Sequence, residues 1–237
     1  MLSEALYLKD PYIKEWEAEV AGVIEGKHII LDRTAFYPGG GGQPHDTGTI
    51  TSGGHAYNVV GLGKDGEKII HEVDRSGLKE EERVKCSINW DRRYKLMRMH
   101  TAAHIIAQMF HMETGALITG GQLGEEQSRI DMSIDVFGRE KLTEYEDRVN
   151  NVIKRNLDVS FKYVPREEAM KDPALFKLAK GFPEHIREVR IVSIGGYDVQ
   201  ADGGTHVRNT KEIGAVKFAG FQNKGKANRR IYYTLEQ

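Results

Sequence analysis

The sequence lacks several features that define secreted, membrane and strongly basic proteins. Its 237 residues include a single cysteine, Cys86, which excludes an internal disulfide and suits a reducing compartment. No run approaches the roughly 18 consecutive apolar residues of a membrane span, and no signal peptide opens the chain, so we expect a cytoplasmic protein with no membrane partner. The formal net charge is −1, so any polyanion must meet a local basic patch rather than an overall positive field.

The first ninety residues or so contain a series of short segments with strand composition. Hydrophobic residues make up 39% of the chain and charged residues 29%, which is the balance of a folded globular protein. Turn residues separate segments of strand length at 27–32, 55–62, 67–73 and 83–90. This spacing predicts a small barrel or sandwich, in which Cys86 has a packing role.

At Trp90 the apolar residues change from strand spacing to helical spacing. Asp91 is the expected N-cap, and the helical spacing runs from Arg92 to Gly115. A further helix is expected over 139–156, and strands are expected over 159–164, 188–194, 214–221 and 229–237. Because helices and strands mix without βαβ order, the sequence predicts an α+β fold with a domain boundary near residue 91.

The segment FYPGGGGQPHDTG, residues 36–48, contains four consecutive glycines. It is not a phosphate-binding P-loop, because no Gly-Lys-Ser/Thr follows, and it lacks the spacing of a dinucleotide fingerprint. Its glycines permit backbone angles that are closed to other residues. The simpler interpretation is a tight crossover at the end of the barrel. The alternative is a backbone-lined surface that is pressed against another domain or a substrate.

Two pairs of polar residues carry the clearest chemical signal. His100 and His104 are four positions apart in MHTAAHII, so on a helix both imidazoles project from one face, one turn apart. Asp202 and His206 have the same spacing in ADGGTHV, where the two glycines between them favour a loop. Either pair alone is a weak signal. Together, a rigid helix and a distant loop offer four groups that suit a tetrahedral zinc site.

The residue types also indicate the kind of zinc site. Structural sites are usually rich in cysteine, whereas catalytic sites use about three protein ligands and leave one position open, so a set without cysteine favours catalysis. A metalloprotease motif needs glutamate directly after the first histidine, and Thr101 stands there, which excludes that mechanism. The metal would instead act as a Lewis acid, an orienting template or a source of hydroxide.

In combination, these motifs resemble a known family. HTAAH and the distal GGTH, with the earlier FYPGGGGQP and the later TKEIG, are similar to the editing module of alanyl-tRNA synthetases. They resemble more closely the free-standing alanyl-tRNA editing proteins called AlaX, and in particular the medium-length members, AlaX-M. The resemblance covers nearly the whole chain. It implies a glycine-motif β-barrel over residues 1–90 and a zinc-dependent editing domain over residues 91–237.

The resemblance also implies an activity and a set of ligands. Members of the family hydrolyse the ester of serine, and in some members glycine, wrongly attached to alanine tRNA. Mischarged tRNA(Ala) is therefore the expected partner, and one zinc ion per chain is the expected cofactor. His100, His104 and His206 match the zinc ligands of the family, whereas Asp202 stands where the family usually has cysteine. Asp202, a harder ligand, either binds zinc directly or through water, or orients a histidine from outside.

The segment LITGGQ, residues 117–122, supplies the candidate catalytic residues. The family carries a threonine hydroxyl near the pocket, and the resemblance places it at Thr119. Gln122, in the same segment, is the second candidate. The alternative for Thr119 is an ordinary turn threonine that bonds its own backbone.

Two basic clusters and two other functions are also consistent with the sequence. The clusters are either phosphate contacts or ordinary solvated faces. They are Arg92, Arg93, Lys95 and Arg98 at the start of the first long helix, and Lys224, Lys226, Arg229 and Arg230 near the C-terminus. The other functions are a zinc hydrolase for a different ester or amide, and a non-catalytic RNA-binding module with a structural metal.

Overall fold

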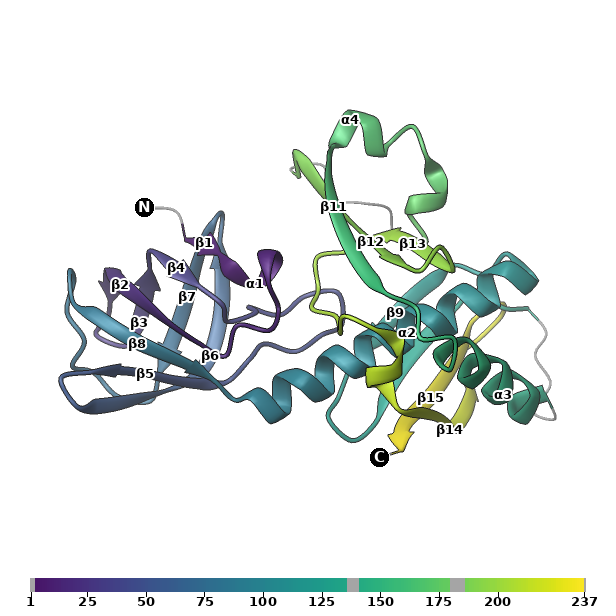
Figure 1. Cartoon of the computed structure of the whole chain (residues 1–237), viewed down its shortest axis with the longest axis horizontal. Helices are drawn as coiled ribbons and strands as arrows, with labels where there is room; N and C mark the ends of the chain where they lie inside the picture. The colour runs from purple at the N-terminus through teal and green to yellow at the C-terminus, as the bar shows by residue number, and fades with distance from the viewer. Residues whose placement is uncertain (1–2, 136–140, 180–185, 237) are drawn as a thin grey trace. The chain divides into compact units, whose positions relative to one another are not determined.

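The computed structural model describes residues 3–135, 141–179 and 186–236, and its fold is mixed α+β, as predicted. The chain divides into two compact units, Met1–Lys95 and Leu96–Gln237 (Figure 1). The division falls within one long helix, α2, which runs from Trp90 to Thr114. Among the described residues, no helix is both long and apolar enough to cross a membrane.

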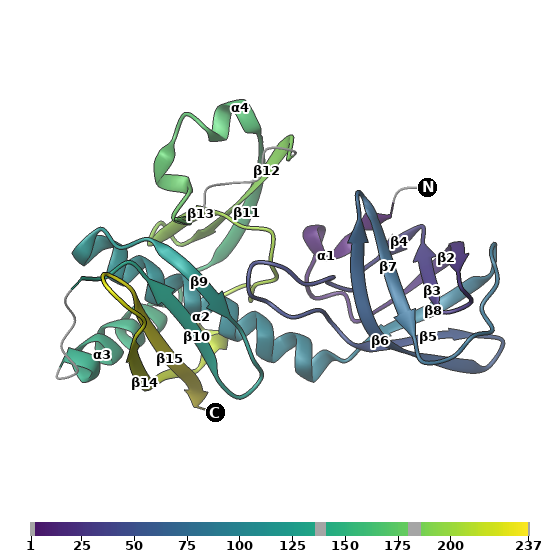
Figure 2. The ribbon, with the colours of Figure 1, turned by 180° about the vertical axis from the view of Figure 1, so that it is seen from behind.

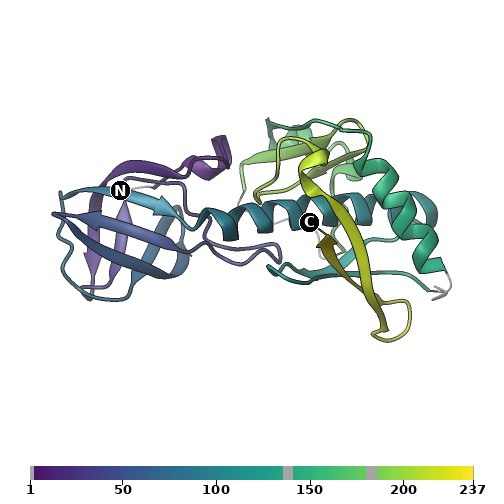
Figure 3. The same ribbon diagram turned by 60° about the horizontal axis from the view of Figure 1, so that its bottom comes forward.

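The first unit is built around a closed barrel with the strand order β2–β3–β7–β6–β5–β8 (Figure 3). The barrel strands are β2 Glu15–Ile24, β3 His28–Leu31, β5 Gly48–Ser52, β6 His55–Asp65, β7 Lys68–Val73 and β8 Arg83–Ile88. Shorter elements precede or interrupt them: β1 Glu4–Ala5, α1 Leu6–Lys9 and β4 Arg33–Thr34. The prediction of strands before residue 90 is confirmed, and the closed order identifies a barrel rather than a sandwich.

Alternating side chains fill the barrel core. In β8 every second residue is buried, and Cys86 is one of the fully buried ones. Burial raises the pKa of the Cys86 thiol to about 12, so the thiol stays protonated and packs as a small apolar group. Gly48 allows β5 to approach β8 closely, because a Cβ there would lie 2.1 Å from the Ser87 carbonyl oxygen.

The glycine block folds as a tight turn that is fastened to the barrel end. Gly39 to Gly42 all have positive φ angles, between 58° and 139°, which favour glycine. Gly40 pairs with Gln43 through backbone hydrogen bonds of 2.9 and 3.0 Å, and the Tyr37 hydroxyl donates to Gly40 O at 3.0 Å. The block therefore forms a tight turn, and its role as a barrel crossover or as a contact surface stays a prediction.

A buried ion pair holds this turn against the first part of α2. Arg93 and Asp46 are both fully buried, and Arg93 Nε donates to the Asp46 carboxylate at 3.0 Å. The other guanidinium nitrogens donate to Pro11 O at 2.8 Å and to Ala35 O at 2.6 Å. Asp46 also accepts from Tyr37 N at 2.6 Å. Arg93 is therefore a structural residue, and its inclusion in a phosphate-contacting cluster is wrong.

The helix α2 begins two residues earlier than its predicted cap implies. The Asn89 side-chain oxygen accepts from Arg92 N at 3.3 Å, and the Asn89 carbonyl accepts from Arg93 N at 3.0 Å. Asn89 is therefore the N-cap, and the prediction of Asp91 is wrong. Asparagine and aspartate both cap helices well, and Asn89 comes first in the chain. Gly115 follows the helix with φ +70°, the left-handed conformation that commonly ends helices.

The second unit contains two sheets and a further helix, α3 (Figure 2). The four-stranded sheet has the order β14–β15–β10–β9, and the three-stranded sheet has the order β11–β12–β13. The elements after α2 are β9 Ile118–Gln122, β10 Ser128–Met132, α3 Leu142–Ile153, β11 Val159–Pro165, α4 Arg166–Ala169, η2 Pro173–Leu175, β12 Glu188–Ile194, β13 Asp198–Ala201, η3 Thr210–Ile213, β14 Ala215–Asn223 and β15 Arg229–Glu236.

The predicted segments of this unit correspond to observed elements. The predicted strands match β11, β12, β14 and β15, although residue 237 lies outside the described residues. The predicted helix over 139–156 corresponds to α3, and its first two residues also lie outside the described part. Three short strands, β9, β10 and β13, are not among the predictions, because five residues or fewer carry little periodicity.

One histidine in the barrel is buried without a charged partner. His71 is fully buried, its Nδ1–H donates to Ile29 O at 2.9 Å, and its Nε2 accepts from the Thr34 hydroxyl at 2.9 Å. Burial lowers the pKa of His71 from 6.5 to about 4. The ring is therefore neutral in the folded barrel at neutral pH.

This burial predicts that acid destabilises the first unit. The unfolded chain protonates His71 near pH 6.5, whereas the folded chain does so only near pH 4, so stability falls as pH drops through that window. Between pH 7 and pH 5 we expect the wild type to lose about 2 kcal/mol that His71→Gln does not lose. Urea titrations followed by tryptophan fluorescence measure this, because both tryptophans, Trp16 and Trp90, lie in Met1–Lys95. Equal pH slopes in the two proteins would contradict it.

Candidate metal centre

The structure brings His100 and His104 together with Asp202 and His206. The first two lie on α2, and the other two lie in the loop that follows β13. One potential ligand atom from each residue lies within 4.8 Å of the others. The rings of His100 and His206 stack with centroids 4.3 Å apart, and the three histidines are only 3–6% exposed. The two pairs therefore form one buried cluster, and metal binding by it stays a prediction.

Asp198, on β13, orients the ring of His104 from outside the cluster. His104 Nδ1–H donates to Asp198 Oδ2 at 2.9 Å, and Asp198 is fully enclosed, with 1% exposure. Asp198 also forms a buried ion pair with Lys177, whose Nζ donates to Gln108 Oε1 at 2.6 Å. Burial alone would raise the pKa of Asp198, but the hydrogen bond from His104 and the charge of Lys177 lower it below 3.8. Because this bond engages Nδ1, Nε2 is the ring nitrogen of His104 that faces Asp202 Oδ1, at 4.0 Å.

Thr101 orients the ring of His206 in the same way that Asp198 orients the ring of His104. The buried Thr101 hydroxyl donates at 3.0 Å to the helix carbonyl four residues earlier, so its oxygen accepts from His206 Nδ1–H at 3.1 Å. His206 Nε2 then faces Asp202 Oδ2 at 3.0 Å. The third ring, His100, is hydrogen-bonded by the backbone of Thr205, and its Nε2 lies 3.5 Å from Asp202 Oδ1.

These contacts direct acceptor atoms toward one another. Burial lowers the pKa of His100 to about 4 and the pKa of His206 well below 6.5, so both rings are neutral near pH 7. Burial would raise the pKa of Asp202, but its interactions with His100 and His206 lower it well below 3.8. His100 and His206 therefore present neutral imidazoles and Asp202 presents an ionised carboxylate, which is the form in which these groups bind a cation.

The loop that carries Asp202 is tied to β12 by Arg190. Asp202 N donates to Arg190 O at 3.0 Å, and Arg190 Nη1 donates to the carbonyl oxygens of Asp202 at 3.2 Å and Gly204 at 2.9 Å. Within the loop, Gly204 N donates to Asp202 Oδ2 at 2.6 Å, which closes a turn around the carboxylate. The predicted loop conformation of this segment is confirmed.

The candidate catalytic residues Thr119 and Gln122 lie on β9 and have hydrogen-bond partners in their own sheet region. The Thr119 hydroxyl donates to Asn228 Oδ1 at 2.9 Å. Gln122 is exposed, and its Oε1 accepts from Arg129 Nε at 3.2 Å. A catalytic role for either residue stays a prediction.

Sequence reasoning missed the residues that support the cluster. Besides Asp198 and Thr101, these include Gln200, which is buried and whose Nε2 lies 2.9 Å from each ring nitrogen of His104. The signal for two of them was present in YDVQAD, because polar residues alternate at Asp198, Gln200 and Asp202. Such alternation is typical of a strand that directs its polar side chains to one face.

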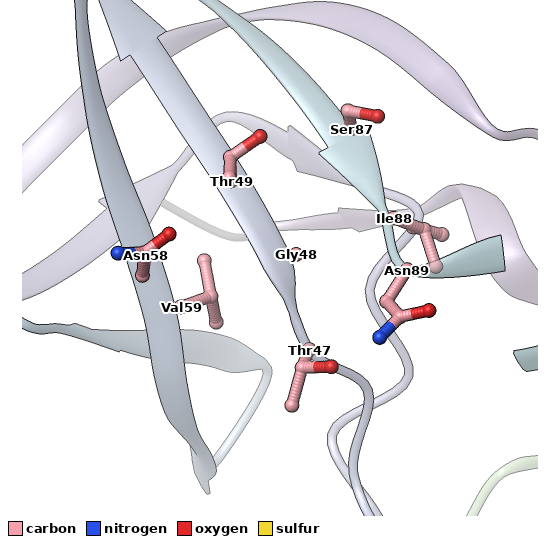
Figure 4. A pocket seen from close by; sticks show the side chains of 8 residues that line it. All are labelled: Thr47, Gly48, Thr49, Asn58, Val59, Ser87, Ile88 and Asn89. Carbon is pink, nitrogen blue, oxygen red and sulfur yellow. The ribbon is translucent and has the colours of Figure 1, made fainter. Parts of the chain in front are cut away.

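A separate hollow lies on the wall of the barrel and has a different chemistry (Figure 4). It has a volume of about 400 Å³, and its lining residues are Thr47, Gly48, Thr49, Asn58, Val59, Ser87, Ile88 and Asn89. These residues offer hydroxyls, amides and apolar surface, with no imidazole, thiol or carboxylate among them. The hollow therefore lacks the groups that hold a metal or transfer a proton, and the cluster on α2 is the better candidate site.

Comparison with known proteins agrees with this choice. The family described as "Threonyl and Alanyl tRNA synthetase second additional domain" matches residues 189–232, which include Asp198, Asp202 and His206. The family described as "tRNA synthetases class II (A)" matches residues 6–92, which include the barrel.

Relatives match the chain over its whole length. The alanyl-tRNA editing protein AlaX-M of Methanosarcina barkeri is 51% identical, and the match covers 99% of both chains. The protein of the same name from Saccharolobus solfataricus is 46% identical over 99% of this chain and 100% of its own. The alanine–tRNA ligase of Pyrobaculum aerophilum is 42% identical over 90% of this chain but only 24% of its own length. The chain therefore belongs to the AlaX-M family of alanyl-tRNA editing proteins.

Proposed function

We propose that this protein is a trans-editing hydrolase that removes a wrongly attached amino acid from tRNA(Ala). The observation that carries the proposal is the buried His100–His104–Asp202–His206 cluster, in a chain that is similar end to end to proteins named for alanyl-tRNA editing. Serine is the proposed amino acid, with glycine as a second substrate. A hydrolase for an unrelated ester and a non-catalytic RNA-binding module are not favoured by these full-length matches.

We further propose zinc as the cofactor, held by the three histidines and Asp202. Three nitrogen donors and one oxygen donor fit the ligand preferences of zinc, and the absence of a thiolate among the four favours a catalytic site. Zinc bound there would polarise the carbonyl of the ester. An aminoacyl ester is already reactive, so this polarisation and correct positioning suffice without a strong general base.

The residues around the cluster have the task of holding its donor atoms in place. Asp198 fixes the tautomer of His104, and Thr101 fixes that of His206, so that each ring presents Nε2. Partners of this kind usually change metal affinity about 10- to 100-fold when they are removed. We therefore assign Asp198 and Thr101 as positioning residues.

We assign tRNA selection to the barrel, residues 1–90, and hydrolysis to residues 91–237. The support for this division is that all four donors lie beyond residue 91, whereas the barrel hollow of Figure 4 is lined by hydroxyl, amide and apolar groups. Chemical cross-linking of bound tRNA to the full chain tests it. Cross-links confined to residues 91–237 would contradict a selective role for the barrel.

The first test of the function concerns the choice between serine and alanine. Serine is larger than alanine by one hydroxyl, so size exclusion cannot spare the correct product, and the pocket must recognise the hydroxyl itself. We expect rapid loss of serine from Ser-tRNA(Ala) and little loss of alanine from Ala-tRNA(Ala). Thr119→Val should narrow the ratio of the two kcat/KM values several-fold, because one neutral hydrogen bond contributes about 1 kcal/mol.

Parallel deacylation assays with both charged tRNAs measure this ratio. Thr143→Val, which makes the same change at an exposed threonine on α3, serves as the comparison. A wild-type protein that leaves Ser-tRNA(Ala) intact would sink the proposed function, whereas an unaltered ratio in Thr119→Val would remove only the role of Thr119.

The second test concerns the metal. We expect about one zinc per chain in the purified protein, and its loss in His100→Ala or His104→Ala. Asp198→Asn keeps the shape of the side chain but weakens the orienting bond to His104, so zinc affinity should fall about 10- to 100-fold. Elemental analysis and chelator competition measure these effects, with exposed Asp65→Asn as the control. Full zinc occupancy in both histidine variants would show that the cluster is not the site.

The third test concerns Asp202 itself. We expect Asp202→Cys to retain zinc and to bind it more tightly, because a thiolate is a softer ligand than a carboxylate. Asp202→Asn, which keeps the size but removes the charge, should bind more weakly. Chelator competition compares the three proteins. Equal affinities in all of them would place Asp202 outside the ligand set.

A further inference from the structure

The three-stranded sheet beside the cluster ends in an exposed pair of aromatic side chains. Phe161 and Tyr163, on the edge strand β11, are each 38% exposed. Among the residues that the structure describes, they are the only aromatic ones in the set of strongly exposed large hydrophobic side chains. Their ring centroids lie 6.2 Å apart in an edge-to-face arrangement. Exposed aromatic rings that gather at one place commonly mark a binding surface.

Strand register places this pair on the face of the sheet that supports the cluster. Tyr163 pairs with Arg190 and Phe161 with Val192 across β11 and β12. Val192 pairs in turn with Gln200 on β13. Directly paired residues share a face, so the aromatic pair lies on the same face as the groups that contact His104. The opposite face packs into a separate core formed by Val164, Ala169, Leu175, Val189 and Ile191.

Arg190 connects the aromatic pair to the loop that carries the donors. Its guanidinium carbon lies 4.5 Å from the centroid of the Phe161 ring. Its Nη1 donates to the carbonyl oxygens of Asp202 and Gly204 at 3.2 and 2.9 Å. One side chain therefore separates the Phe161 ring from the donor loop. A molecule that places one group at the cluster could therefore stack a neighbouring flat ring on Phe161.

We propose that Phe161 and Tyr163 form a stacking platform for the terminal unpaired base of the tRNA 3′ end. The proposal rests on the proposed function, because the ester to be cleaved joins the amino acid to the terminal ribose, and that ribose carries this base. With the ester at the cluster, the base lies within one nucleotide of it. Arg190, which contacts both the loop of Asp202 and the Phe161 ring, links these two places. Proteins bind unpaired bases by stacking them on exposed aromatic rings, and this needs no base-specific hydrogen bond.

Binding of an acceptor-stem RNA that carries 2-aminopurine as its last base tests the platform directly. Stacking quenches the fluorescence of this base, so we expect quenching with the wild type. Phe161→Leu and Tyr163→Leu should reduce the quenching and weaken binding roughly five- to hundredfold, the range found for loss of one aromatic stacking contact. Tyr163→Phe, which keeps the ring, should behave like the wild type. Met112→Ala, which removes another strongly exposed side chain, is the control.

Hydrolysis of two substrates separates this proposal from the proposed function. On seryl-RNA, the leucine variants should raise KM with little change in kcat, and on serine methyl ester, which has no base, they should match the wild type. Ring-dependent quenching without any hydrolysis by the wild type would support the platform and sink the editing function. Hydrolysis of seryl-RNA with unchanged KM in both leucine variants would overturn the platform. An equal loss of kcat/KM on seryl-RNA and on serine methyl ester would also overturn the platform, because Phe161 would then act through Arg190 on the donor loop.

Discussion

The candidate site depends on four largely buried side chains, His100, His104, Asp202 and His206, whose potential ligand atoms face one another. The Nε2 atoms of His206 and His104 lie 3.0 and 4.0 Å from the carboxylate of Asp202. Protein groups also support this set, because Asp202 Oδ2 accepts from Gly204 N at 2.6 Å and Gln200 Nε2 lies 2.9 Å from His104 Nε2. The ion pair of Arg93 and Asp46 is the opposite case, because each nitrogen of the guanidinium donates to an acceptor. The Arg93 pair is complete within the protein, whereas the cluster gathers four donor groups that could hold a cation.

The three-stranded sheet supplies both the support for this cluster and its surroundings. Because paired residues share a face, one register fixes Asp198 and Gln200 beside His104 and Phe161 at the edge of the same surface. The other face is occupied by an apolar core. A shift of one residue between β12 and β13 would move Asp198 and Gln200 into that core and remove the orienting bond to His104. The support of the candidate metal centre and the proposed base platform thus depend on the same strand pairing.

The sequence predicts the parts of this site that follow from local geometry. His100 and His104 are predictable because helical spacing relates four residues to one turn. The approach of the Asp202 loop to α2 depends on tertiary structure. The sequence indicates this approach only when the residue types of both pairs are considered together. Asp198 was missed because its strand has four residues, too few for a clear period. Arg93 was misjudged because charge predicts exposure, whereas its burial depends on Asp46, at a sequence distance of 47 residues.

The two carboxylate oxygens of Asp202 make different contacts. Oδ2 accepts from Gly204 N at 2.6 Å and faces His206, whereas Oδ1 is the atom nearest His100 Nε2, at 3.5 Å. A cysteine thiolate at this position would offer a single atom for both contacts. In this chain, therefore, the bond that closes the turn and the donor that faces His100 do not compete for one atom. The loop can keep its shape in the absence of a cation, because its turn is closed by protein atoms alone.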